Sequence, residues 1–218
     1  MTTILMTSRI AFLGLWAAIF GQAAILDRIA VTVGKRVIAE SDVIRYIRVA
    51  AFIDQRPIDQ SGEEKRKAAD RIVDQYLILQ EAAFSRVPLP AEDSAVAMLQ
   101  PIKAQYHEDA DYRATLKRYE ISESDVVNHL LAGLQAMRFT DLRFRPEVEI
   151  SDDDLHEFYN TLAAGWRQKN PDQVPSLEAS RDEVEKLLTD QRTAQALDRW
   201  LGIQRNETQI LYHDQVFE

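Results

Sequence analysis

The sequence predicts a mainly α-helical protein: a helical body with a small N-terminal hairpin that is completed by a C-terminal strand. Amphipathic runs with apolar residues near a 3.6-residue period fill the middle of the chain, whereas period-two alternation occurs at its two ends. Only seven glycines and seven prolines are present, which disfavours an all-β fold with many tight turns. With 218 residues, 46% of them hydrophobic, the chain can bury the core of one or two domains.

Residues 1–24 are typical of a secretory signal peptide. Arg9 is the only charged residue and precedes an apolar run of eleven residues, Ile10 to Phe20. The cleavage region that follows consists of small residues: Gly21, Ala23 and Ala24. Cleavage fits after either alanine. Because a membrane span needs ~20 apolar residues, we expect a periplasmic protein that meets the membrane only transiently; an uncleaved inner-membrane anchor is the alternative.

Two short strands joined by a tight turn follow the leader. Residues Ile29–Val33 alternate in the pattern of a half-buried strand. Gly34-Lys35 has the Gly-X order of a type II′ turn, and Val37-Ile38 starts the returning strand. Ser41 and Asp42 then offer an N-cap and an acidic first turn for a helix.

Helices are predicted in most of the chain that follows. They cover 63–84, 92–106, 112–119 and 177–205, and two more begin at Ser122 and Ser151. Asp125 and Asp154 stand three residues after those serines, as in a capping box. Pro101 is expected to kink or divide the second helix. The stretch 165–176 is the most loop-like part of the mature chain.

A last strand is predicted near the C-terminus. Thr208, Ile210 and Tyr212 alternate with Gln209 and Leu211. Since two strands alone are marginally stable, we expect this strand to be the third partner of the N-terminal hairpin.

The sequence offers no strong catalytic or metal-binding motif. Cysteine is absent, as are the G-x-S-x-G, P-loop and G-x-G-x-x-G patterns. The acidic cluster His-Glu-Asp-Ala-Asp, residues 107–111, lacks the spacing of a calcium loop and is predicted to be an interhelical loop. His129 lies in an apolar helical run, where a core or boundary position is expected. We therefore predict no cofactor, no metal and no catalytic residue, and the formal charge of −9 disfavours nucleic acid as a partner.

Several motifs carry a family likeness. The stretch LDRIAVTVGKRVIAESDV, residues 26–43, resembles the opening of the SurA-type periplasmic chaperones. RIVDQYLILQEA, residues 71–82, is similar to a helix of that family. ISESDV (121–126) and RFRPEVEISDDDLHEFY (143–159) resemble its later helix starts. The likeness runs over nearly all of the mature chain and implies a helical chaperone core.

The chain departs from the family plan in one place. In that plan, parvulin-type prolyl isomerase domains follow the segment equivalent to ISDDDLHEFY. Here only 17 residues, Asn160 to Ser176, precede the last long helix, and a domain needs at least ~50. The resemblance thus implies a SurA N-terminal-like domain (25–160), a loop in place of the isomerase (161–176), and a C-terminal helix and strand (177–218) that pack back on the first domain.

The resemblance implies an ATP-independent chaperone rather than an enzyme. It would hold unfolded outer-membrane or secreted proteins, its clients, in an apolar crevice. Two alternatives stay open: a scaffold or assembly subunit with one dedicated periplasmic partner, and a degenerate prolyl isomerase. The oligomeric state, including a dimer, is also open.

Four residues are candidates for client binding, because methionine and tyrosine can form a soft apolar surface. They are Met98, Tyr106, Tyr112 and Met137. The alternative for each is ordinary core packing at helical spacing.

Overall fold

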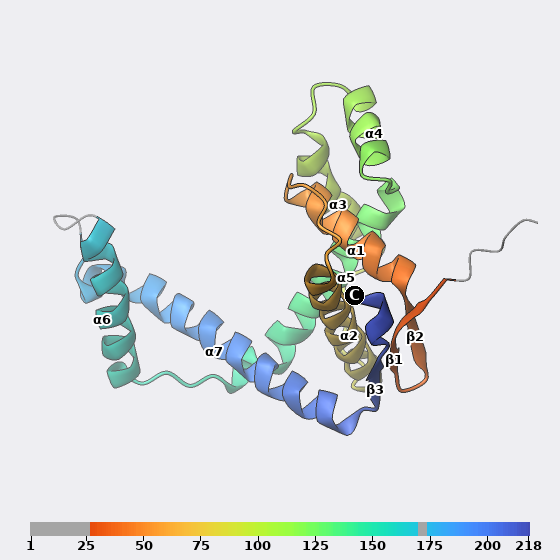
Figure 1. Ribbon diagram of the computed structural model, residues 1–218. Helices are drawn as coiled ribbons and strands as arrows, with labels where there is room; N and C mark the ends of the chain where they lie inside the picture. The colour runs from red at the N-terminus through yellow and green to blue at the C-terminus, as the bar shows by residue number, and fades with distance from the viewer. Residues whose placement is uncertain (1–26, 170–173) are drawn as a thin grey trace, which may run out of the picture.

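The computed structural model describes residues 27–169 and 174–218. The predicted leader and its cleavage region, Gly21, Ala23 and Ala24, lie outside the described residues. In the described part the elements are β1 (Ile29–Val33), β2 (Arg36–Ala39), α1 (Glu40–Ile53), α2 (Gly62–Phe84), α3 (Glu92–Lys103), α4 (Asp109–Arg118), α5 (Glu123–Arg143), α6 (Asp152–Lys169), α7 (Leu177–Glu207) and β3 (Ile210–Tyr212) (Figure 1). The prediction of a mainly α fold is confirmed.

The strands form one antiparallel sheet in the order β2-β1-β3. Gly34 has a φ of +56° and Lys35 does not share this positive φ, as a type II′ turn requires. On the other side of β1, Val31 pairs with Tyr212 of β3. The prediction that the C-terminal strand completes the hairpin is therefore confirmed.

Both predicted capping boxes are present. At the start of α5 the Asp125 N–H donates to the Ser122 hydroxyl at 3.1 Å, and the Ser122 N–H donates to the Asp125 carboxylate at 2.8 Å. Ser151 and Asp154 make the same exchange at the start of α6, at 3.2 and 2.9 Å. Each exchange satisfies two backbone donors that the helix itself cannot satisfy.

The first helix begins two residues earlier than predicted. Ala39 occupies the N-cap position and Glu40 is the first helical residue. The Ala39 N–H donates to the Asp42 carboxylate at 3.1 Å. Ser41 already lies in the first turn, and its N–H donates to Asp27 at 3.1 Å. The prediction of a Ser41 cap is wrong because the aspartate, rather than the serine, satisfies the free donor of this helix start.

Three hydrophobic clusters hold the body together. The first lies between the sheet and helices α1 and α2, and it contains the fully buried Val31 and Val73. The second joins α1 to α3, α4 and α5 around Phe52. The third joins α2 and α5 to the C-terminal half of α7, where the rings of Phe139 and Trp200 lie 5.5 Å apart. The last helix thus packs back on the N-terminal part of the chain.

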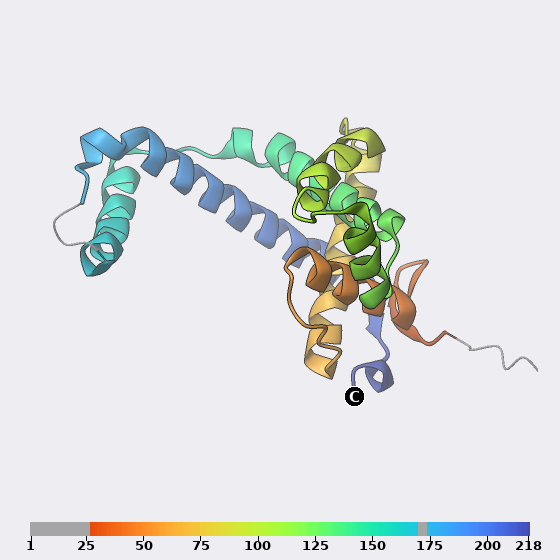
Figure 2. The ribbon, with the colours of Figure 1, turned by 90° about the horizontal axis from the view of Figure 1, so that it is seen from above.

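Helix α6 and the N-terminal half of α7 extend from this body as a two-helix arm (Figures 1 and 2). Ala163 and Val184 are fully buried within the arm. Arg192 donates to the Asp154 carboxylate at 3.2 Å and to the Glu149 carbonyl at 2.6 Å, so α7 is tied to the start of α6. Although α7 is 31 residues long, no helix in the described part of the chain is apolar enough to span a membrane.

The loop predicted over 161–176 is shorter than expected. Helix α6 continues to Lys169, so residues 161–169 are helical, and α7 starts at Leu177. A glycine inside a helix costs only about 1 kcal/mol relative to alanine. Gly165 is itself exposed, and the packing of other residues of α6 against α7 offsets this cost. The Tyr159 hydroxyl of α6 donates to the carbonyl of Pro175, just before α7, at 2.7 Å. Residues 170–173 of the predicted loop lie outside the described residues.

Candidate functional site

Two cavities lie on either side of an aromatic pair, Tyr46 from α1 and His129 from α5. Their ring centroids are 4.8 Å apart and their planes are inclined by 54°. Tyr46 precedes the buried Ile47, so it projects about 100° around the helix, at the edge of the buried face. Helix α2 completes both cavities opposite this pair.

The first of these, the apolar cavity, has a volume of about 340 Å³. Apart from the aromatic pair, its apolar lining consists of Ile38, Val49, Ile72, Tyr76, Leu79 and Ala132. Arg45 stands at its rim and pairs with Asp42 at 3.0 Å and with Asp125 at 3.4 Å. A cavity of this size, apolar inside and bordered by paired charges, is of the kind that takes apolar side chains or small ligands.

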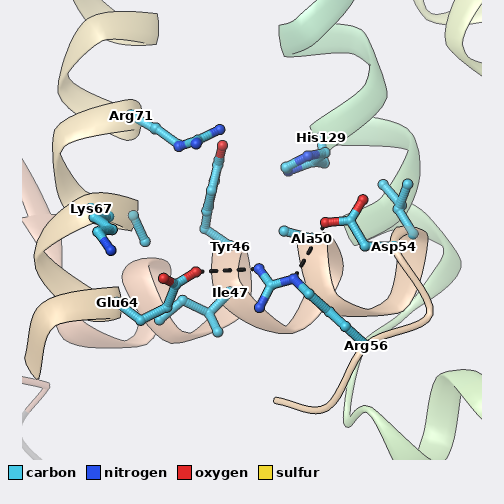
Figure 3. A pocket seen from close by; sticks show the side chains of 11 residues that line it. Tyr46, Ile47, Ala50, Asp54, Arg56, Glu64, Lys67, Arg71 and His129 are labelled. Atoms are coloured by element: carbon cyan, nitrogen blue, oxygen red, sulfur yellow. Dashed lines mark hydrogen bonds and ion pairs between the residues drawn. The ribbon is translucent and has the colours of Figure 1, made fainter. Parts of the chain in front are cut away.

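The second, the polar cavity, has a volume of about 240 Å³ and is drawn in Figure 3. Charged side chains from α2 and from the loop that precedes it border the cavity: Asp54, Arg56, Glu64, Lys67 and Arg71. Arg56 donates to Asp54 at 3.3 Å and to Glu64 at 3.2 Å, which are the two dashed contacts of Figure 3. The two acids of the cavity therefore share one arginine.

Burial keeps both members of the aromatic pair neutral near pH 7. Burial raises the pKa of Tyr46, and the nearby positive charge of Arg71 opposes that rise. Burial lowers the pKa of His129, while the negative charge of Asp54 opposes that change. The wall between the cavities is thus an uncharged surface with polar atoms at its edges.

The four client-binding candidates lie outside both cavities. The exposed fraction is 42% for Met98 and 56% for Met137. Tyr106 is partly buried, and Tyr112 is only 2% exposed. Both tyrosine rings contact Phe52 in the second hydrophobic cluster, at centroid distances of 6.4 and 6.2 Å. Tyr112 is therefore a core residue, and its burial leaves no exposed surface for a client to contact.

Little in the sequence indicated that these residues would line a cavity. Ile72, Tyr76 and Leu79 follow the apolar period of α2 and look like core residues. The position of His129 at the core boundary, between apolar neighbours, was the one indication of a polar atom near this surface. The cavities form only where α1, α2 and α5 meet.

The acidic cluster at 107–111 does not gather into a loop site. Asp109 and Asp111 stand in the first turn of α4, where acidic side chains complement the helix dipole. The arrangement around Tyr46 and His129 brings together an apolar cavity, a polar cavity and an aromatic wall. A scan of protein-family models and a search of curated proteins give no match for this chain.

Proposed function

We propose that the protein is an ATP-independent periplasmic chaperone that holds unfolded segments of outer-membrane or secreted proteins. The observation that carries the proposal is the apolar cavity between α1, α2 and α5, which is open to an incoming apolar side chain. The likeness of residues 26–43 and 71–82 to SurA-type chaperones supports it, because both stretches contribute to this cavity through Ile38, Ile72 and Leu79.

Helices α2, α5 and α7 also have exposed apolar side chains outside the cavity. Phe84 at the end of α2 is 85% exposed, Met137 of α5 is 56% exposed, and Ile203 of α7 is 54% exposed. These three helices meet in the third hydrophobic cluster. Exposed apolar groups among charged neighbours are typical of surfaces that bind other chains. Many weak contacts of this kind give the reversible binding that a holding chaperone needs.

The net charge of −9 is compatible with this role, since a strongly charged protein keeps itself and a bound unfolded segment in solution. The arm of α6 and α7 increases the reach of the molecule beyond its body (Figure 2). Neither feature requires a nucleotide or a metal.

Aggregation suppression tests the proposal directly. Denatured outer-membrane porin is diluted with and without the purified chain, and light scattering is followed in the absence of ATP. We expect suppression near a stoichiometric ratio. No suppression at large excess, with the protein shown to be folded by circular dichroism, would overturn the proposal and favour a scaffold with one dedicated partner.

A matched pair of variants assigns the activity to the cavity. Leu79→Gln replaces an apolar side chain of the cavity lining with a polar one, and we expect it to lose most of the suppression because a client's apolar side chain then loses an apolar contact. Leu187→Gln makes the same change on α7, at a residue 40% exposed and outside both cavities. It should retain the activity of the unmodified protein. Equal activity of the two variants would move the client site away from the cavity.

A further inference from the structure

We propose that an unfolded segment binds this protein as a fourth strand along the outer edge of β2, with one of its apolar side chains in the apolar cavity. This inference rests on the proposed function and adds how the backbone of the client is held. β2 is an edge strand, because the order of the sheet is β2-β1-β3 (Figure 1). Its outer edge therefore has no strand beside it in the described part of the chain.

Hydrogen bonds on the β3 side of β1 show which way its backbone groups point. The Gly34 N–H donates to the Gln209 carbonyl at 2.8 Å, and the His213 N–H donates to the Ala30 carbonyl at 2.9 Å. Even-numbered residues on this side of the hairpin thus turn their backbone groups to β3. Because successive residues of a paired strand turn these groups to opposite sides, the odd-numbered residues of β1 turn theirs to β2.

The backbone groups of Val37 point to the open edge. Val31 pairs with Ile38 and Val33 pairs with Arg36, so Ile38 and Arg36 turn their N–H and C=O groups to β1. Val37 stands between them and turns its own groups away. No loop or side chain among residues 27–169 and 174–218 bonds to these two groups, and Val37 is 47% exposed. A free N–H and C=O on one edge are what an added strand pairs with.

The apolar cavity lies under this same edge. Of the sheet residues that the structure describes, Arg36 and Ile38 line the cavity, and none from β1 or β3 does. Both side chains alternate with that of Val37 and therefore lie on the opposite, inner face. Since neighbouring strands lie about 4.8 Å apart, a strand added beside β2 carries its inward side chains over the cavity. The client residue that pairs with Val37 faces solvent, and the residue next to it faces the cavity.

The charge of the edge favours a client over a second copy of this chain. Lys35 and Arg36 directly precede Val37, and both are exposed. Two copies paired edge to edge through Val37 would bring these basic residues of both chains together, and like charges in neighbouring strands are destabilising. Charged residues of this kind are a common means of preventing pairing between edges of identical chains. An unfolded segment without basic residues meets no such repulsion.

The opposite edge of the sheet has no equivalent cavity. By the same alternation, the N–H of Tyr212 points away from β1 on the far side of β3. No residue of β3 lines the apolar or the polar cavity. A strand added there would gain backbone hydrogen bonds but no place for its apolar side chain. The amide of Tyr212 is therefore an internal control for that of Val37.

Amide hydrogen exchange tests the pairing directly. A short apolar peptide with blocked ends is added to the purified, isotope-labelled chain, and the exchange of individual amides is followed by NMR. We expect the Val37 amide to exchange about tenfold more slowly at saturating peptide, as for a newly formed hydrogen bond, and the Tyr212 amide to be unchanged. The same peptide with every backbone N–H methylated offers the same side chains but cannot add to a strand edge. It should not slow the exchange of Val37.

Two variants at one position separate the backbone from the side chain. Val37→Pro removes the N–H from the edge, and edge strands tolerate proline. Val37→Ala also shortens the side chain but keeps the N–H. Measured by fluorescence anisotropy with the labelled peptide, Val37→Pro should weaken binding about fivefold, as for the loss of one hydrogen bond, and Val37→Ala should bind like the unmodified protein. Circular dichroism and thermal unfolding show whether both variants are folded, and the exchange measurement does not depend on them.

The outcomes separate the two proposals. An unchanged Val37 amide at saturating peptide, or equal slowing at Tyr212, overturns the edge pairing and leaves the chaperone proposal intact. Equal affinities of folded Val37→Pro and Val37→Ala do the same. Protection of Val37 that is present without peptide and grows with protein concentration would assign the edge to a second copy instead. If the peptide does not bind and aggregation is not suppressed, the proposed function itself fails.

Discussion

The carbonyl oxygen of Phe217 lies where a side chain at position 62 would begin: a β-carbon built on Gly62 would be 1.7 Å from that oxygen. The C-terminal tail therefore rests directly on the start of α2. Lys65, one turn further along α2, donates to the Val216 carbonyl at 3.2 Å and so holds the tail in the same place. This contact joins the last residues of the chain to the body that contains both cavities.

Gly62→Ala should destabilise the protein. The added methyl group meets backbone atoms rather than the end of a flexible side chain, so the tail has to move away from α2. We expect a loss of about 1–3 kcal/mol in the free energy of unfolding, the usual range for overpacking. Urea denaturation followed by circular dichroism measures this loss.

Gly133→Ala is the matched control. Gly133 lies inside α5, and a β-carbon there meets nothing within 4 Å. Alanine should stabilise that helix by about 0.5–1 kcal/mol. If both variants shift the unfolding midpoint in the same direction, the close approach of the tail to α2 is not the reason why position 62 requires glycine.

Arg205→Met should loosen the end of α7 from α2. Arg205 donates to the carboxylates of Asp74 at 2.7 Å and Asp70 at 3.2 Å, to the Asp70 carbonyl at 3.0 Å and to the Tyr212 hydroxyl at 3.3 Å. Loss of the guanidinium leaves two carboxylates without this partner, and we expect a cost of about 1.5–3 kcal/mol, the range for a hydrogen bond to a charged group. Chemical denaturation gives the value.

Arg199→Met, on the exposed side of the same helix, provides the control for that change. It should shift the free energy of unfolding by no more than about 0.5 kcal/mol. An equal loss in both variants would mean that the loss of an arginine charge anywhere on α7, rather than the loss of this network, lowers the stability.

His129 should make stability depend on pH in the mildly acidic range. Burial lowers its pKa below the ordinary value of 6.5, so the unfolded chain takes up a proton at a higher pH than the folded protein does. The stability that His129 contributes is therefore present above pH 6.5 and is lost as the pH falls below that value. The slope is at most about 1.4 kcal/mol per pH unit for one group.

His129→Phe keeps a ring against Tyr46 and removes the titrating group. Urea midpoints measured from pH 7.5 to 5 should fall less steeply for this variant than for the unmodified protein. Identical slopes would show that other groups account for the pH dependence in this range.

Burial predicts opposite effects for the methionine and tyrosine candidates. Tyr112→Ala should cost about 3–5 kcal/mol of stability, because it leaves a cavity beside Phe52 in the second cluster. Met98→Ser and Met137→Ser change exposed side chains and should alter stability by no more than about 0.5 kcal/mol. Under the proposed function, the methionine variants should reduce aggregation suppression while remaining fully folded. Unchanged suppression would remove these two residues from the client surface.

Local patterns predicted most of the secondary structure but not the cavities. The alternation in 29–33 and the Ser122–Asp125 spacing act within a few residues, and both predictions agree with the structure. The cavities depend on where Tyr46, Leu79 and His129 meet from three helices, which no local period encodes.

Burial of individual aromatic residues was equally hard to predict. Tyrosines occur both in cores and on client-binding surfaces, so residue type alone does not distinguish the two. The rings of Tyr106 and Tyr112 both pack against Phe52. The helical stretch 161–169 was missed for a related reason, since tertiary contacts with α7 outweigh its glycine. In each case packing between distant segments decided the outcome.

Because β1 pairs with β3, the sheet can be completed only late in the synthesis of the chain. β1 is among the first described residues to be made, yet its second hydrogen-bonded neighbour is among the last. Contacts such as those between α3 and α5 are closer in sequence and can form earlier. Until Ile210 to Tyr212 have been made, one edge of β1 has no strand beside it, and unpaired strand edges are sites of aggregation and proteolysis. A chain that stops before β3 would therefore itself be an unfinished protein in need of a chaperone.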